Sequence, residues 1–538
     1  MQYFKYIKNP LIIQIVFSFF YTIAIAVIPY LHKLLFDTVG NGEYDNLINL
    51  VVYYVIAIFA SAILQYISQT HEWKTAVDFF IAVKQIVFNS FMFYKTPRFR
   101  GKNVGEYISI LDNDINELEQ LKLEGIIDII KSVNMLIIYT VALVYFIDLR
   151  IALVIITSSL ISAFVPKLIA KKLADKKKKY LKYLGEYINY TDDFFKGHSS
   201  LDLDSKEKIC QENYKNLLKM ENSKLEFGFF KTFANITNGF VMDIISLSSF
   251  VMVGYLLIKG EITVGTGVAT FSYIESFIYP IKYILNDINA INAAKEVDKS
   301  ISSIINENDQ NTRETTEYDK PMKLEFKNVN VQRGDFRLKN FSYIFEAGKK
   351  YVLTGPSGSG KSTILSLIRG EILPENGELL LNEKTVEEDS IKKIISGIYQ
   401  QDHVFYADYH DNCSLFDTYK PDYEKIERQF KPGLIKRIKN RQDCRELSGG
   451  EKQILLLMRN YTSKKQIILL DEVFTSIDLV NREDAKEFIF NADAQIFLSV
   501  THDVSEENLR NYDEILVMKN GELMRSGNYD ELAELSYS

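Results

Sequence analysis

The residues best suited to chemistry lie in one short run in the second half of the chain, which fits the pattern G-x-x-x-x-G-K-[ST]. An apolar, strand-like stretch precedes the run and a helical pattern follows it. The glycines leave backbone N–H groups free to surround phosphate oxygens, Lys361 can reach terminal phosphates, and the Ser362 hydroxyl can ligate Mg²⁺. The run therefore predicts a nucleotide site, made of Gly355, Pro356, Ser357, Gly358, Ser359, Gly360, Lys361, Ser362 and Thr363.

A pair of carboxylates follows a second apolar run about a hundred residues later. The run 467–470 ends in Asp471 and Glu472. A strand that ends in a carboxylate places Asp471 beside the phosphate loop, where it can serve the Mg²⁺ shell. Glu472 can then accept a proton from the attacking water. Turn capping is the structural alternative for two acids at the end of a strand.

A third element, Leu447–Glu451, has the form of a capping box that opens a helix. Ser448 and Glu451 stand three residues apart, and Gly449 and Gly450 leave the first N–H groups of the helix open to an anion. An ordinary helix cap has the same local pattern, so this element gains meaning only beside the other two.

The elements that must position these groups form an α/β domain. Strand-like runs at 323–331, 351–354, 394–398, 467–470 and 496–500 alternate with helical patterns, which predicts a largely parallel sheet. A polar segment with almost no apolar residues comes before it and marks a linker. We expect a membrane domain at 1–305, the linker at 306–322 and an ATP-binding domain at 323–538.

The first 300 residues hold the apolar segments. Each is about long enough to cross a bilayer, which takes about 20 residues. Lysine-rich, helically patterned connections at 70–125 and 170–232 mark the cytoplasmic side. The predicted fold is a multidomain membrane protein: a six-helix all-α transmembrane domain with long cytoplasmic helical extensions, followed by an α/β P-loop ATPase domain. The six spans are 10–31, 47–70, 126–147, 151–167, 233–258 and 264–285.

Ionisable residues inside the predicted spans are costly in hydrocarbon and usually face an interior or a wet cavity. Asp128 and Lys131 are spaced to pair with each other. Asp243 and Glu275 are better suited to a substrate cavity, although an interhelical hydrogen bond explains them equally well. The net charge of −7 gives no reason to expect a nucleic-acid partner, and the three scattered cysteines form no disulfide or zinc pattern.

Taken together and in this order, these motifs resemble ABC transporters of the exporter type, in which a membrane domain is fused to an ATPase domain. Gln401 matches the family's glutamine loop, which senses Mg²⁺, and His502 follows the strand-like run 496–500. The resemblance implies a dimer that encloses two ATP molecules, with Ser448 and Gly450 of one copy facing the phosphate loop of the other. It also implies that His502 holds the γ-phosphate near Glu472 and that Asp478 lies at the dimer interface.

Three positions depart from the family pattern. Arg333 stands where an aromatic residue usually stacks on adenine, although arginine can also stack on a ring and Phe336 is nearby. The stretch 401–447 is shorter than is typical, which predicts a reduced helical subdomain. The segment 439–446 lacks the glycine-and-glutamate element that exporters often carry.

The sequence thus predicts a dimeric, ATP-driven exporter in the cytoplasmic membrane, with its ATPase domain in the cytoplasm and ATP and Mg²⁺ as cofactors. A homodimer is favoured because one chain holds every hydrolytic motif, and an obligate heterodimer is the alternative. Other readings are an importer of exporter-like fold, a soluble P-loop ATPase, which the spans oppose, and a membrane sensor without turnover, which Glu472 and His502 oppose. Peptides, lipids and hydrophobic drugs remain open as substrates; the absence of a protease domain before the first span argues against a peptide-processing exporter.

Overall fold

The structure, a computed structural model, describes residues 4–162, 165–310, 322–334, 336–386, 388–399 and 402–534. The chain folds as two compact units. The first comprises Met1–Met92 and Val104–Asn308, and the second comprises Phe93–Asn103 and Asp309–Ser538. The short segment Phe93–Asn103 therefore leaves the membrane unit and packs with the ATPase unit.

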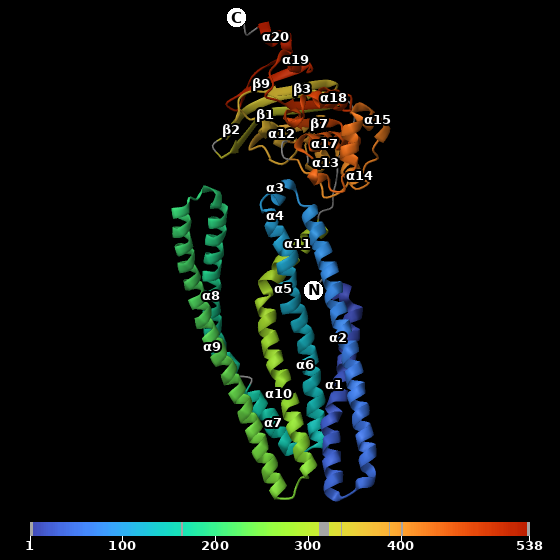
Figure 1. The fold of residues 1–538 in the computed structure, drawn as a ribbon, viewed down its shortest axis with the longest axis vertical. Coiled ribbons are helices and arrows are strands. Elements are labelled where there is room, and N and C mark those ends of the chain that lie inside the picture. Colours follow the sequence, from blue (N-terminus) through green and yellow to red (C-terminus); the bar gives the residue numbers. More distant parts are fainter. Residues whose placement is uncertain are drawn as a thin grey trace. The chain divides into compact units, whose positions relative to one another are not determined.

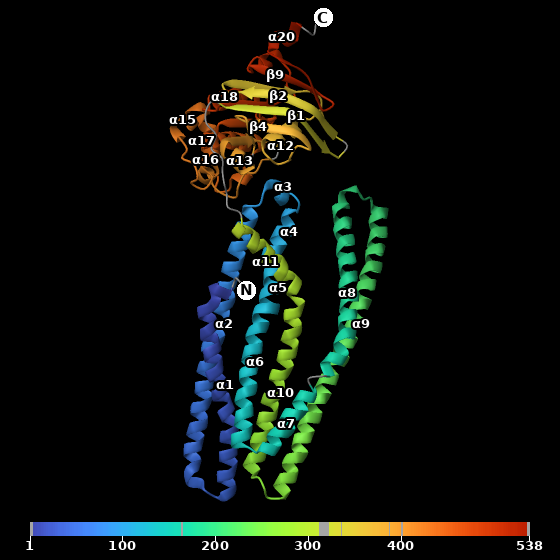
Figure 2. The same ribbon diagram turned by 180° about the vertical axis from the view of Figure 1, so that it is seen from behind.

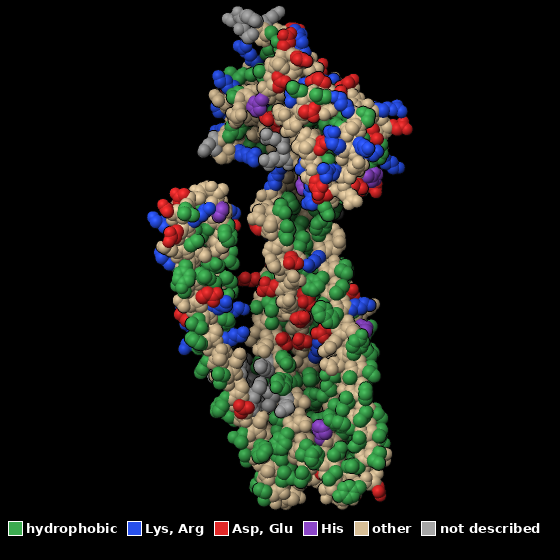
Figure 3. All heavy atoms as spheres, in the orientation of Figure 1, with side chains coloured by type: hydrophobic (Ala, Val, Ile, Leu, Met, Phe, Trp, Pro, Cys, Tyr) green, Lys and Arg blue, Asp and Glu red, His purple; other side chains and the backbone are tan. Residues whose placement is uncertain are grey.

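The first unit is built of long helices (Figure 1). On the face shown in Figure 3, hydrophobic side chains are abundant over the part of this unit that holds the predicted spans. Long helices with apolar side chains suit a lipid environment, because each helix satisfies its own backbone hydrogen bonds and exposes little polar surface. The main helices are α1 (Phe4–Asn41), α2 (Leu47–Met92), α6 (Glu124–Phe146), α7 (Leu149–Ser162), α8 (Val165–Lys196), α9 (Leu203–Ile258), α10 (Val264–Ala293) and α11 (Lys295–Gln310).

Four helical stretches among the described residues are long and apolar enough to cross a membrane: Lys5–Asn41, Tyr44–Met92, Val104–Ile147 and Leu203–Ile258. They contain the first, second, third and fifth predicted spans. The fourth, 151–167, lies on α7 and the start of α8, with residues 163 and 164 outside the described part. The sixth, 264–285, lies on α10.

Both long connections are helical, as their periodicity predicts. Two π-helical turns interrupt the helical course from Val104 to Phe146, a feature that the sequence does not signal. The successive pieces are α4 (Val104–Ser109), η2 (Ile110–Asp114), α5 (Ile115–Leu118), η3 (Glu119–Leu123) and α6.

The entry to α10 is fixed by a close approach to α1. Thr263 caps α10 by accepting a hydrogen bond from the Thr266 amide, and Asp37 of α1 accepts one from the Gly265 amide at 3.0 Å. A Cβ at Gly265 would lie 2.3 Å from the Lys33 carbonyl oxygen, so only glycine fits there.

The ionisable residues in the spans divide into three cases. Lys131 donates to Asp128 at 3.2 Å, as the spacing predicts, and also to Glu72 at 2.9 Å. Asp243 is exposed on α9 within the single chain. The side chain of Glu275 lies outside the described residues. A cavity role for Asp243 and Glu275 stays a prediction.

The second unit contains two sheets, where the sequence predicts one largely parallel sheet (Figures 1 and 2). The predicted sheet is six-stranded, in the order β10-β9-β3-β8-β7-β6, with parallel pairing from β9 to β6 and β10 antiparallel at one edge. The second sheet is antiparallel, in the order β2-β1-β4-β5. The strands are β1 (Lys323–Arg333), β2 (Phe336–Glu346), β3 (Lys349–Thr354), β4 (Asn376–Leu381), β5 (Lys384–Thr385), β6 (Ile395–Ile398), β7 (Ile467–Asp471), β8 (Ile496–Val500), β9 (Glu514–Lys519) and β10 (Glu522–Gly527).

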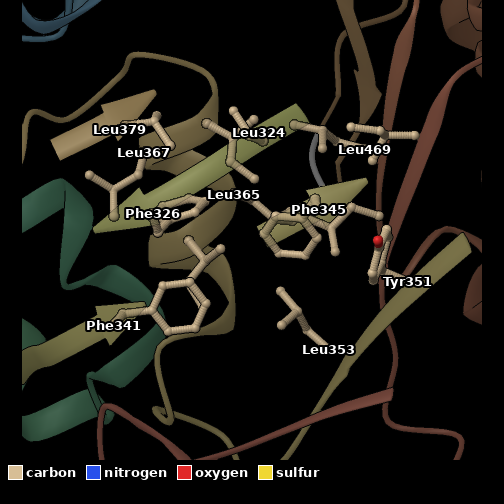
Figure 4. Packing of buried hydrophobic residues seen from close by; sticks show 14 of the residues in the cluster. Leu324, Phe326, Phe341, Phe345, Tyr351, Leu353, Leu365, Leu367, Leu379 and Leu469 are labelled. Carbon is tan, nitrogen blue, oxygen red and sulfur yellow. The ribbon is translucent and has the colours of Figure 1, made fainter. Parts of the chain in front are cut away.

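The two sheets close over one apolar core (Figure 4). Phe326 of β1 meets Phe341 and Phe345 of β2 in edge-to-face contacts, with ring centroids 5.1 and 6.0 Å apart. Leu353 of β3 and Leu365 of the following helix are fully buried in the same cluster. This packing holds the strand and the helix on either side of the phosphate loop in a fixed relation.

Short helices surround the six-stranded sheet, and a second apolar cluster lies beneath several of them. The helices are α3 (Thr96–Phe99), α12 (Lys361–Ile368), α13 (Glu388–Ile394), α14 (Tyr409–Ser414), α15 (Tyr423–Gln429), α16 (Pro432–Lys439), α17 (Gly449–Ser463), α18 (Leu479–Phe490), α19 (Glu506–Leu509) and α20 (Tyr529–Glu534).

A buried arginine joins α17 to the segment after Gln401. Arg459 donates to the Asn412 backbone oxygen at 2.8 Å, to the Asn412 side-chain oxygen at 2.7 Å and to the His403 backbone oxygen at 2.9 Å. Burial lowers the pKa of Arg459 from its usual value. Asn412 is itself fully buried and donates to the Phe405, Ala407 and Asp408 carbonyls.

Arg459→Leu should therefore destabilise the ATPase unit by about 2–4 kcal/mol, because it leaves buried acceptors without a donor. In thermal unfolding of the full chain, we expect the transition of this unit to fall by roughly 5–15 °C. Arg428→Leu removes an exposed guanidinium from the same unit and serves as the matched control. Equal shifts for the two variants would contradict this role of Arg459.

Candidate nucleotide-binding site

The phosphate loop connects β3 to α12, as its sequence pattern requires. Gly355 and Gly360 have φ values of 138° and 109°, which favour glycine. A Cβ at Gly355 would lie 2.2 Å from the Met518 carbonyl oxygen, and one at Gly360 would lie 2.8 Å from the Phe336 ring. The loop therefore depends on the absence of side chains at these two positions.

Two polar groups in this loop are set up for an anion. The Lys361 ammonium donates to the Gly355 and Pro356 carbonyls at 2.9 and 3.0 Å, and burial lowers its pKa. The Ser359 hydroxyl is buried, and no described residue pairs with it. A bound phosphate would offer Lys361 a full counter-charge and Ser359 an acceptor, so the loop fits the ligand that its sequence predicts.

The predicted carboxylates lie at the carboxyl edge of the same sheet. Asp471 ends β7 and pairs in register with Val500 of β8. Burial raises the pKa of the Asp471 carboxyl, and the neighbouring Glu472 raises it further. A cation beside Asp471 would favour its charged form.

Glu472 and His502 meet directly. The His502 Nε2 lies 2.9 Å from Glu472 Oε1. Glu472 has a φ of 54°, unusual for a residue with a side chain, and its amide donates to the Val500 carbonyl. Because strained backbone at such a position is held by its surroundings, the geometry fixes the direction of this carboxylate.

The predicted Mg²⁺ ligands fall partly outside the described residues. Ser362 lies in the first turn of α12 and Asp471 ends β7, whereas Gln401 is not described. Among the described residues, no group of three or more histidine, cysteine or acidic side chains is arranged to hold a metal ion. A hydroxyl and a carboxylate still fit Mg²⁺, which takes few protein ligands and fills its shell with water and phosphate oxygens.

The capping box predicted at Ser448 is present. The Ser448 hydroxyl accepts from the Glu451 amide, and Glu451 accepts from the Ser448 amide at 3.1 Å. Gly449 is exposed, and a Cβ at Gly450 would lie 3.0 Å from the Ser476 carbonyl oxygen. The segment Leu447–Glu451, called the signature below, thus packs closely on the segment that leads to Asp478.

Asp478 caps α18 and accepts hydrogen bonds from the Val480 and Asn481 amides and from the Asn481 side chain. These bonds keep the pKa of its carboxyl below the usual value. The structure gives Asp478 a local structural role, and its predicted place at a dimer interface stays a prediction.

Arg333 lies at the tip of the β1–β2 hairpin, directly opposite Phe336, and its side chain is exposed. The Phe336 ring reaches the position where a Cβ on Gly360 would stand. An aromatic ring therefore borders the phosphate loop even though arginine holds the usual aromatic position.

The sequence does not predict a chain of charged contacts between Phe93–Asn103 and the end of α12. Arg100 makes two parallel hydrogen bonds to Glu371, at 2.8 and 2.9 Å. Glu371 also pairs with Arg369 at 2.7 Å, and the Arg369 guanidinium lies 3.6 Å from the centre of the Tyr399 ring. Tyr399 stands two residues before Gln401, so this chain of contacts ends next to the predicted glutamine loop.

Comparison with known proteins gives two family matches. Residues 11–281 match the family described as the ABC transporter transmembrane region, and residues 338–475 match the family described as ABC transporter. The chain belongs to the ABC transporter family. It is a half-transporter, with one membrane region fused to one ATPase region, and the membrane region is multi-pass.

Curated relatives are similar over most of this ABC transporter. An ATP-dependent lipid A-core flippase of Pasteurella multocida is 24% identical over 95% of this chain and 90% of its own length. An uncharacterized ABC transporter ATP-binding protein, YfiC, of Bacillus subtilis is 24% identical over 81% of this chain and 75% of its own.

A solved structure shares the fold. A bacterial Atm1-family ABC exporter with ATP bound superposes with a TM-score of 0.80, covering 99% of this chain and 96% of that one at 16% identity. The family and the fold confirm an ABC ATPase coupled to transport and a chain that binds ATP.

Proposed function

We propose that the chain is an exporter that moves a small amphipathic molecule or peptide out of the cytoplasm across the cytoplasmic membrane, as a dimer. The proposal rests on one observation: the Glu472 and His502 side chains contact each other at the end of β7. They lie at the same edge of the sheet as the phosphate loop. The similarity to a lipid A-core flippase in sequence and to an ABC exporter in fold supports outward transport.

The residues divide the work of ATP hydrolysis. Lys361 and the amides of the phosphate loop hold the β- and γ-phosphates, while Glu472 takes the proton of the attacking water. His502 orients Glu472 and contacts the γ-phosphate. Mg²⁺, held by Ser362, Asp471 and Gln401, would neutralise charge on the phosphate oxygens. Phe336 and Arg333 would pack against the base.

Two copies complete each site. Within one chain the Ser448 hydroxyl donates to Glu451 at 2.9 Å and accepts from the Glu451 amide, so its hydrogen bonds are local. A second copy would bring its phosphate loop to the first amides of α17, where a helix N-terminus favours negative charge. Because one chain holds all of these elements, a homodimer is sufficient.

Arg100 and Glu371 transmit movement between the ATPase unit and the connection that follows α2. Arg100 lies on a segment continuous with α2, and Glu371 follows α12, which starts at Lys361. A bidentate arginine–carboxylate pair fixes both distance and orientation. A shift of α12 on nucleotide binding would therefore displace the segment that bears Arg100.

Glu472→Gln should leave ATP binding near the wild-type level and slow hydrolysis by about 10²–10⁴-fold, because the general base is lost and the phosphate cradle is kept. We would measure ATPase rate and nucleotide affinity of the full chain, expressed alone, in lipid nanodiscs. Glu507→Gln, an exposed carboxylate elsewhere in the unit, is the control. Wild-type turnover in Glu472→Gln would show that another group activates water.

Arg100→Glu should uncouple the two activities. We expect ATPase activity to remain within severalfold of wild type while ATP-dependent vesicle transport of a fluorescent substrate falls at least tenfold. Unchanged transport in this variant would contradict a coupling role for the Arg100–Glu371 pair.

A further inference from the structure

A cavity of about 630 Å³ lies in the membrane unit between α2 and the interrupted helix that precedes α6. It belongs to neither the nucleotide site nor the apolar surface of the spans. Residues of α2 line one side, and residues of α5, η3 and α6 line the other. The lining includes Glu72, Trp73, Glu119, Leu123, Glu124 and Ile127.

Glu119 is the unusual group in this cavity. Its residue is only 5% exposed, and the carboxylates of Glu72 and Glu124 line the same cavity. A largely buried carboxylate beside other carboxylates is costly to keep charged. Glu119 also begins the π-helical turn η3, a feature that often marks functional sites.

The nearby lysines do not neutralise Glu119. Lys122, in the same turn, pairs with Asp298 of α11 at 2.5 Å. Lys131 is held by Glu72 and Asp128. Glu72 and Glu124 lie close enough to repel a charge on Glu119. Acidic side chains accordingly gather where α5, α6 and α10 lie (Figures 1 and 3).

The rest of the lining is suited to an organic group. Leu123 and Ile127 are buried on one side, and Phe80 is half-buried on the other. Trp73 stands at the rim with 75% of its surface exposed. An indole face beside carboxylates is the combination that attracts quaternary ammonium groups.

We propose that this cavity binds an amphipathic organic cation, with the positive charge at Glu119 and Glu124 and the apolar part against Trp73 and Leu123. The assignment rests on the proposed export function and gives a chemical class to the molecule that the membrane unit takes up. A metal ion is a poorer fit, because one wall of the cavity is apolar and the described residues hold no cluster of metal ligands.

Trp73 is the only tryptophan of the chain, so its fluorescence reports directly on the cavity. We would titrate the purified full chain in lipid–detergent micelles with benzyltrimethylammonium and compare neutral benzyl alcohol. Saturable quenching by the cation alone is expected. Glu119→Gln should weaken the affinity about tenfold or more, as expected for loss of a partly buried charged partner, and Glu124→Gln should weaken it less.

Glu117→Gln removes an exposed carboxylate two residues before Glu119, outside the cavity lining, and should leave the affinity within twofold of wild type. The site would be overturned if the wild-type chain showed no saturable quenching. It would also be overturned if Glu119→Gln and Glu124→Gln both bound the cation with wild-type affinity. Basal ATPase activity of the same preparation distinguishes failure of the cation site from failure of the proposed export function. Activity without cation binding would overturn only this inference, whereas a folded chain without activity would count against the proposed function.

Discussion

The burial of charge at the carboxyl edge of the parallel sheet is the constraint on which the rest of the ATPase unit depends. Lys361 begins the helix that follows β3, Asp471 ends β7 and is followed by Glu472, and His502 follows β8. Burial lowers the pKa of Lys361 and raises that of Asp471, so the surroundings disfavour the charged form of each side chain. A nucleotide with its metal supplies the opposite charge to both. The site is therefore completed by its substrate.

The same groups connect to more distant parts of the unit through buried polar contacts. Arg459 joins the signature helix α17 to the segment that follows Gln401, and Arg369 reaches Tyr399 just before it. These contacts reach His403 and Tyr399, the described residues that flank Gln401 in the sequence. Arg369 also pairs with Glu371, and Glu371 pairs with Arg100, which lies on the segment that follows α2 in the chain. Such a chain can carry a change at the phosphate loop to the membrane region, because packed polar networks favour discrete arrangements.

The sequence predicts local patterns well, because each depends on neighbouring residues. The phosphate loop, the strand that ends at Asp471 and the capping box at Ser448 follow from spacing alone, and the structure has all three elements. The run 323–331 is a strand, as predicted, but it lies in the antiparallel sheet as β1. That antiparallel pairing, the π-helical turns and the Arg100–Glu371 pair have no local sequence signal. The ion pair joins positions 271 residues apart, which no local pattern can relate. The roles assigned to Gln401 and Glu275 lie outside what the structure describes, and those of Asp243 and Asp478 depend on a second copy.

The central claim is that two copies share each ATPase site, and a complementation experiment tests it most directly. Lys361→Ala disables the phosphate loop, and Ser448→Arg blocks the signature, so each variant alone should be inactive. Co-expression with two different affinity tags allows the mixed dimer to be purified. In that dimer, one site joins an intact phosphate loop to an intact signature. The account predicts ATPase activity in the mixed dimer well above that of either parent, up to about half of the wild-type rate. A mixed dimer as inactive as its parents, or an active Ser448→Arg homodimer with a normal thermal transition, would contradict it.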